Sequence, residues 1–285
     1  MNDYVLITDA ASGLSPEDID IIPMPLEIEG TEFFYGDKDE TITAERFYEK
    51  MREGAYPSTS QVSPSVYTEH FERFFKEGKD ILYLGFSSGL SGTLQSSVLA
   101  KKILRDDYPE RNIYCIDTLS ASAGEGFLVK EALKRKEAGY TYEELLDFVE
   151  THKQRVAHWF TIDTLDYLEH GGRVPAAAAS LGALLHIKPV LSVDEEGKLT
   201  LVSMPRGKKK AVSFLLSKME EEWDSAMGKK VVIGHTDDLP KAEELRDLVL
   251  ERFPEADTEI VLIDPVIASH TGPGMLAMVY WKKQS

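Results

Sequence analysis

The chain contains a single cysteine, Cys115, so no disulfide can form within it. Positive charge is also scarce, because 32 lysines and arginines face 49 acidic residues, for a net charge of −17. We expect this charge to repel nucleic acid and anionic membranes. No apolar run reaches the roughly 18 residues that a membrane span needs. These absences predict a soluble, cytoplasmic protein that neither binds nucleic acid nor inserts stably into a membrane.

Signatures of bound metal and nucleotide are missing as well. The seven histidines show no spacing typical of metal ligands, and no glycine-rich Walker loop occurs. The N-terminus lacks the basic and apolar segments of a signal peptide. We therefore expect no metal, no cofactor and no nucleotide site of the chain's own.

The first half alternates strand-like and helix-like patterns, which predicts a parallel sheet with helices on both faces. Ser63 and Pro64 are typical of a helix start. We assign residues 1–155 to a Rossmann-like α/β domain. Its predicted strands are 4–8, 81–86 and 113–116, and its helices are 43–53, 94–104, 126–136, 142–155 and one beginning at Ser63.

The second half predicts a second α/β domain, residues 156–285, with a mixed or antiparallel sheet. Residues 189–193 and 199–203 read as an antiparallel pair joined by a turn. Clefts between two such domains commonly bind small molecules, so we expect the ligand site there. The remaining predicted helices are 164–170, 175–185, 209–223 and 240–253, and the strands are 231–234, 259–263 and 276–281.

A serine-rich turn between a predicted strand and a predicted helix is the most informative segment, at residues 86–93. Unpaired amides at a helix start favour an anion, and Ser88, Ser91 and Thr93 can donate hydrogen bonds. Gly89 and Gly92 would permit positive φ and close approach of a ligand. The simpler interpretation is a strand–helix turn with a serine cap. A hydrolase elbow would need glycine where Thr93 stands.

Other segments are less distinctive when each is read alone. Residues 58–61 fit a polar loop, and His270 beside a Gly-Pro-Gly turn is more often structural than functional. The alanines of residues 175–185 leave space that either a long alkyl ligand or bulky neighbouring side chains would fill. The basic run 206–210 is either a solvated face or a contact for phosphate or a partner.

Taken together, short motifs along almost the whole chain resemble those of the DegV family of bacterial proteins, in the family's order. The matching segments are residues 7–9, 59–61, 87–93, 117–118, 171–173, 188–189, 206–209 and 270–274.

The resemblance implies a two-domain protein that binds a long-chain fatty acid and has no nucleotide site of its own. In some family members the protein is the acyl-carrying subunit of a fatty acid kinase, and a separate ATP-dependent subunit phosphorylates the bound carboxylate. The motifs place the carboxylate contacts at Thr59, Ser91 and His270, with Ser60 and Ser88 as second choices.

Two arginines carry the family's partner contacts by the same resemblance. Arg173 and Arg206 would assist the acyl phosphate or dock the kinase subunit. The chain departs from the family at Ala10, where serine is usual, and this removes one hydroxyl near the end of the first strand.

Two other functions fit the same residues. A serine esterase or acyltransferase would use Ser91 with His270. A regulatory protein that senses a small anion would use the serine-rich turn alone.

Overall fold

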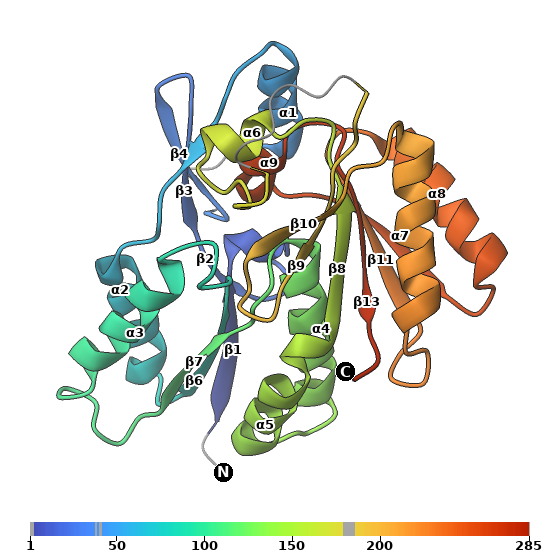
Figure 1. Ribbon diagram of the computed structural model, residues 1–285. Helices are drawn as coiled ribbons and strands as arrows, with labels where there is room; N and C mark the ends of the chain where they lie inside the picture. The colour runs from blue at the N-terminus through green and yellow to red at the C-terminus, as the bar shows by residue number, and fades with distance from the viewer. Residues whose placement is uncertain (1–2, 38, 40–41, 179–185, 285) are drawn as a thin grey trace.

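The elements of the chain form five layers in the computed structural model, which describes residues 3–37, 39, 42–178 and 186–284 (Figure 1). Two sheets stand side by side with helix α4 between them, and further helices cover the outer face of each sheet (Figure 1). The predicted α/β fold, with one parallel and one mixed sheet, is confirmed.

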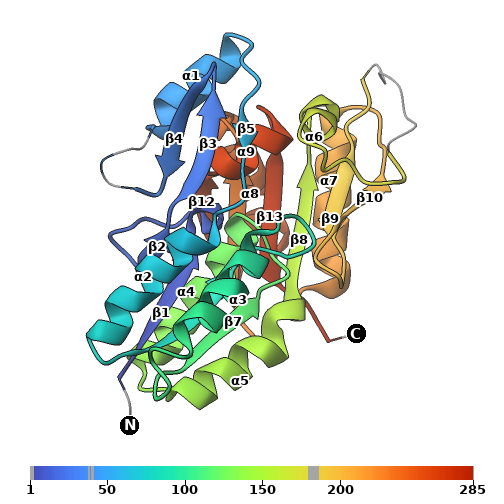
Figure 2. The same ribbon diagram turned by 90° about the vertical axis from the view of Figure 1, so that its left-hand side faces the viewer.

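The parallel sheet belongs to the first half and has the strand order β2-β1-β6-β7. Every neighbouring pair is parallel, and such pairs need crossover segments between them. Figure 2 shows α2 and α3 together on one face. The elements are β1 (Tyr4–Asp9), η1 (Ala10–Ser12), β2 (Asp20–Ile22), α2 (Pro64–Lys76), β6 (Asp80–Gly85), α3 (Thr93–Leu104), β7 (Ile113–Asp117), α4 (Ala123–Glu137), α5 (Tyr142–His152) and η2 (Lys153–Arg155).

The mixed sheet belongs to the second half and has the order β10-β9-β8-β13-β11-β12. Only the β11–β12 pair is parallel, and the predicted antiparallel pair β9–β10 is present. Helices α7 and α8 cover its outer face (Figure 1). The elements are β8 (Val156–Thr161), β9 (Val190–Val193), β10 (Leu199–Ser203), α7 (Lys208–Glu222), β11 (Lys230–His235), α8 (Leu239–Arg252), β12 (Asp257–Leu262) and β13 (Leu276–Trp281).

A third, antiparallel sheet was not predicted from the sequence. Its order is β4-β3-β5, and Glu29 and Gly30 join β3 to β4 with positive φ at both positions, as in a type I′ turn. The polar loop predicted at residues 58–61 is wrong in part, because Ser58–Thr59 pairs with β3. The elements are β3 (Met24–Ile28), β4 (Thr31–Tyr35), α1 (Ala44–Arg52) and β5 (Ser58–Thr59).

Two short helices complete the fold, α6 (Asp166–His170) and α9 (Pro265–Thr271), and the sequence patterns missed α9. The helix predicted at residues 175–185 falls mostly outside the described residues, and its described part forms a turn at 176–178. Within the described ranges, no helix combines the length and the apolar character that crossing a bilayer requires.

The largest hydrophobic cluster draws on both halves of the chain. Trp281 of β13 packs edge-on against Phe127 of α4, with ring centroids 5.0 Å apart, and both side chains are buried. Apolar packing therefore crosses residue 155, and a domain boundary at that residue stays a prediction.

Two buried carboxylates hold the segments that leave the strands. Asp9 ends β1 and accepts hydrogen bonds from the Phe86 amide at 2.9 Å and the Tyr83 hydroxyl at 2.6 Å. Asp264 caps α9, accepting from the Ile267 amide at 2.9 Å and from Ser122 Oγ at 3.1 Å. Burial raises the pKa of both carboxyls, and that of Asp264 reaches about 7.

The raised pKa of Asp264 predicts a pH-dependent stability. Between its ordinary value of 3.8 and about 7, the folded chain retains a proton that the unfolded chain releases. The free energy of unfolding therefore falls as pH rises, by up to about 1.4 kcal/mol per pH unit from this group. Residue 264 cannot ionise in the Asp264→Asn variant. The free energy of unfolding of this variant, minus that of wild type, should therefore rise by about 1–3 kcal/mol from pH 5 to pH 7.

Urea unfolding at pH 5, 6 and 7 measures this difference. Glu243→Gln, at an exposed position of α8, is the matched control and should give a constant difference from wild type. A difference between Asp264→Asn and wild type that does not change with pH would contradict the assignment.

Candidate functional site

A mostly apolar cavity lies where α9, the serine-rich turn and the start of α4 meet the inner face of the mixed sheet. It encloses an empty space of about 870 Å³, counting the solvent at its mouth. Both halves of the chain contribute to its wall. Its apolar lining includes Phe86, Phe160, Leu168, Val193, Leu199 and Val279.

The polar end of the cavity is built by β5 and α9. A hydrogen bond of 2.8 Å joins Thr59 Oγ1 to His270 Nε2, and both residues line the cavity. Thr59 is fixed because β5 pairs with β3, and His270 is fixed because α9 begins at its Asp264 cap. The structure thus brings together two of the three carboxylate contacts that the motifs indicate.

His270 is held as a neutral side chain. Burial lowers its pKa to about 4, and the nearby Arg173 and His170 act in the same direction. Its Nδ1 is buried without a hydrogen-bond partner among the described residues, and Gly171 packs so closely that a Cβ there would lie 2.1 Å from this nitrogen. With a hydrogen on Nε2, the ring donates to Thr59 and leaves the threonine hydroxyl free to donate to a ligand.

The serine-rich turn places Ser91 in the cavity wall just before α3. The Ser91 hydroxyl donates to Thr93 Oγ1 at 2.9 Å, and rotation about its C–O bond would turn the hydrogen toward the cavity. Neither glycine of the turn adopts the positive φ that glycine permits. Gly89 instead lies against the backbone of residues 196–197, and Gly92 against the Gln61 side chain.

The other predicted contacts lie in three different settings. Ser60 and Arg173 line the cavity, and the Arg173 side chain donates to the Leu90 carbonyl at 3.3 Å. Ser88 does not line it, because its hydroxyl and amide both donate to Asp117. Arg206 is exposed on the segment before α7 and also lies outside the lining.

Ala10 is buried at the start of η1, and its side chain faces Gly36 rather than the cavity.

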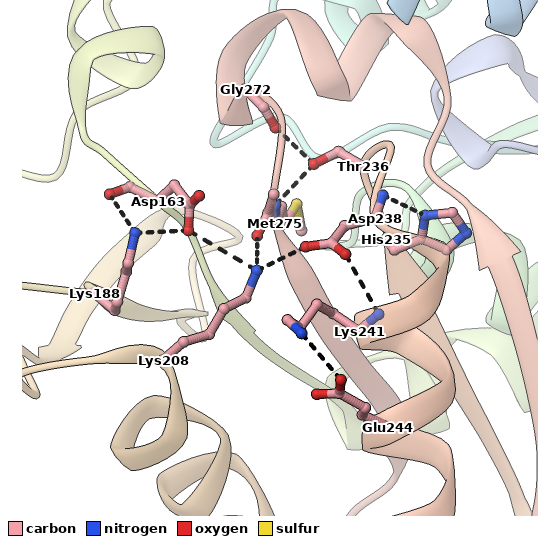
Figure 3. Close-up of polar contacts among 11 residues, drawn as sticks. Asp163, Lys188, Lys208, His235, Thr236, Asp238, Lys241, Glu244, Gly272 and Met275 are labelled. Carbon is pink, nitrogen blue, oxygen red and sulfur yellow. Dashed lines mark hydrogen bonds and ion pairs between the residues drawn. The ribbon is translucent and has the colours of Figure 1, made fainter.

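Lysines from two of the family-like motifs lie near the connection between α9 and β13, and one of them contacts it (Figure 3). Lys208 Nζ donates to the Gly274 carbonyl at 3.1 Å and pairs with Asp238 at 3.0 Å. Lys188 pairs with Asp163 at 2.8 Å on the same edge of the sheet. Lys208 therefore positions the segment that follows His270, and neither lysine lines the cavity.

Among the polar lining residues, Ser122 and His158 lie outside the predicted motifs. Ser122 precedes α4 with φ of 51° and joins the cavity wall to Asp264. His158 stands in the middle of β8. The only sequence signal for Ser122 was the run of small residues at 120–124. His158 is a lone histidine in an apolar strand and gave no signal.

The arrangement suits an amphiphile with a small polar head. Neutral hydroxyl and imidazole donors meet at one end, and the rest of the wall is largely apolar. Within the described part of the chain, no group of three or more histidine, cysteine or acidic side chains is arranged to hold a metal ion.

Known proteins resemble this chain over almost its whole length. A DegV domain-containing protein of Clostridium perfringens is 38% identical over 285 residues, covering 98% of each chain. A fatty-acid-binding DegV family protein from Thermus thermophilus has a TM-score of 0.85 at 31% identity, covering 99% of this chain and 100% of that one.

A third protein shares the fold at lower identity. The fatty acid kinase B3 protein of Streptococcus pneumoniae, loaded with linoleic acid, has a TM-score of 0.84 at 23% identity and covers 99% of this chain and 100% of that one. At that identity the likeness shows the fold alone. The family model described as "Uncharacterised protein, DegV family" matches residues 4–283. The resemblance in the motifs is confirmed, and the chain belongs to the DegV family.

Proposed function

We propose that this chain binds a long-chain fatty acid, with the carboxylate held by Thr59, Ser91 and His270 and the acyl tail inside the cavity. The observation that carries the proposal is the Thr59–His270 hydrogen bond at the polar end of a largely apolar cavity. Ser60, which also lines the cavity, is a further donor. The similar protein from Thermus thermophilus binds fatty acid, which supports the same class of ligand.

The acyl tail and the carboxylate of a bound fatty acid contribute differently to binding, because burial is favourable for methylenes and unfavourable for a charged group. Each buried methylene contributes about 0.8 kcal/mol, so a long tail supplies the affinity. A buried carboxylate is costly unless several donors converge on it. Since His270 is neutral and its one N–H donates to Thr59, it acts on the carboxylate by orienting the Thr59 hydroxyl and not through a full ion pair. The hydroxyls of Thr59 and Ser91 would donate to the carboxylate.

The geometry favours this carrier role over an esterase. A serine nucleophile needs a base within hydrogen-bond reach, and the base needs a third group to orient it. His270 is bonded to Thr59, while the Ser91 hydroxyl is bonded to Thr93. Among the described residues, His270 Nδ1 has no acidic partner. A small anion would also leave the apolar wall unused.

We further propose that the loaded chain presents the carboxylate to a separate ATP-dependent fatty acid kinase subunit in the cytoplasm. Arg173 supports this role, because it lines the cavity and is exposed. Its guanidinium could approach both the head group and a docked partner. Arg206 is exposed on the segment before α7 and would contribute to docking.

The carboxylate site is tested by Thr59→Val, which removes one hydroxyl while preserving shape. We expect its affinity for stearic acid to fall about ten- to hundredfold, because a hydrogen bond to a charged group is lost. Calorimetric titration of delipidated protein measures the affinity, and mass spectrometry of extracted lipid shows what the purified protein carries. Thr31→Val, exposed on β4, is the matched control. Unchanged affinity in Thr59→Val, or a wild type that never binds fatty acid, would contradict the proposal.

Presentation to the kinase is tested by Arg173→Ala. We expect fatty acid binding to remain, while acyl phosphate formation with ATP and the kinase subunit falls about tenfold or more, because a charged contact is lost. Arg105→Ala, exposed at the end of α3, should behave as wild type. If the fatty acid bound to Arg173→Ala and to Arg206→Ala is phosphorylated as fully as in wild type, neither arginine contributes to presentation to the kinase subunit.

A further inference from the structure

Gln61 lies where the cavity opens to solvent, because it lines the cavity and is exposed. It follows Thr59 by two residues and so belongs to the segment that supplies the carboxylate contacts. Its side-chain amide makes no hydrogen bond to any described residue, which leaves both hydrogens of the amino group without a protein partner. Since the residue is exposed, a ligand at the cavity mouth can reach these donors.

The position of Gln61 is fixed by its neighbours on both sides. The Ser60 amide donates to a carbonyl of β3 at 3.3 Å, and the Val62 amide donates to Thr93 Oγ1 at 3.3 Å. The side chain packs closely against the serine-rich turn, because a Cβ at Gly92 would lie 2.2 Å from Gln61 Oε1. Gly92 has φ of −74°, which other residues also adopt, so this glycine leaves room for the amide and is not needed for the backbone conformation.

The amino group of Gln61 faces away from the turn. A Cβ at Gly92 would lie 3.9 Å from Nε2 but only 2.2 Å from Oε1, so the oxygen of the amide is the atom against the backbone. The two N–H donors are therefore directed away from the backbone of the turn.

Arg173 contacts the same turn two residues earlier. Its Nε donates to the Leu90 carbonyl at 3.3 Å, while Gln61 packs on Gly92, and Ser91 between them lines the cavity. Consecutive Cα atoms are 3.8 Å apart, so the two contacted residues lie within about 7.6 Å of each other. The guanidinium and the amide are thus held beside the residues that immediately precede and follow Ser91.

The charge of Arg173 is not neutralised by a carboxylate among the described residues, since its printed partners are two carbonyls. The guanidinium also acts on His270, whose pKa it helps to lower, so its charge is felt at the carboxylate site. In a chain of net charge −17, a cation without an acidic partner beside neutral donors favours an anionic ligand.

The donors at the mouth differ in depth from those for the carboxylate. Thr59, Ser91 and His270 are only partly exposed, whereas Gln61 and Arg173 are exposed. A phosphoryl group joined to the carboxylate would extend it toward the mouth and add three oxygens that need donors. An amide with two free N–H groups and a guanidinium suit such oxygens.

We propose that Gln61 and Arg173 bind the phosphoryl group of an acyl phosphate, with the Gln61 amino group and the guanidinium donating to its oxygens. The inference rests on the proposed function and adds the reaction product to the ligands of the cavity. In the transfer, a carboxylate oxygen attacks the terminal phosphorus of ATP held by the kinase subunit. The bond from that phosphorus to ADP breaks, and ADP leaves with the bonding electrons. No proton moves, so Gln61 binds and orients the group and does not act as an acid or a base.

The test compares two ligands of the delipidated protein by calorimetric titration. One is stearic acid, and the other is the phosphonate analogue of stearoyl phosphate in which a methylene replaces the bridging oxygen. In Gln61→Met, which has a similar length and no donor, the affinity for the analogue relative to stearic acid should fall about tenfold or more, because a hydrogen bond to a charged group is lost. Gln61→Glu places a negative charge there and should lower the ratio further. Gln154→Met, exposed on η2, is the matched control and should leave the ratio unchanged.

Stearic acid separates the ways in which the test can fail. If wild type binds stearic acid but not the analogue, or if Gln61→Met gives the wild-type ratio, the inference is overturned and the fatty acid function stands. An equal loss of both ligands in Gln61→Met would place Gln61 at the carboxylate and also overturn it. If wild type binds neither ligand, the inference and the fatty acid function are overturned together.

Discussion

The hydrogen bond between Thr59 and His270 is the contact on which the candidate site depends, and it joins residues 211 positions apart in the sequence. It exists only because two very short elements are held in place. β5 has two residues and is anchored by β3, while α9 has seven residues and begins at the Asp264 cap. Lys208 braces the segment that follows α9. The polar end of the cavity is therefore assembled by tertiary contacts and not by any single motif.

Burial controls charge throughout this region. The same loss of water that keeps His270 neutral also raises the pKa of Glu125 and Asp264. Ser122 both lines the cavity and donates to Asp264, so this acid lies close to the space that a ligand would enter. A protonated Asp264 would repel a bound carboxylate less than an ionised one. The proton on Asp264 thus affects both the stability of the fold and the ability of the cavity to accept an anionic head group.

The sequence predicted the regular parts of this arrangement and missed the irregular ones. Helix and strand patterns located β6, α3 and β7 to within one residue at each end, because their periodicity is strong. β5 is too short to show any period, and α9 could be inferred only from an aspartate followed by proline. Family motifs, and not local patterns, selected Thr59, Ser91 and His270. His158 and Asp264 were missed because a polar residue inside an apolar run has no local signature of its role.

Shape and polarity would contribute unequally to the choice of ligand. An apolar wall distinguishes chains that differ by one methylene only weakly, by about 1–3 kcal/mol. The donors at the polar end discriminate differently, because a ligand without an acceptor in its head group would remove the Thr59 and Ser91 hydroxyls from water without giving them a partner for their hydrogens. The discrimination then acts against the ligand that lacks the acceptor and not against the one that has it. Two hydroxyls in an otherwise largely apolar wall can therefore select the head group more sharply than the size of the cavity selects the length of the tail.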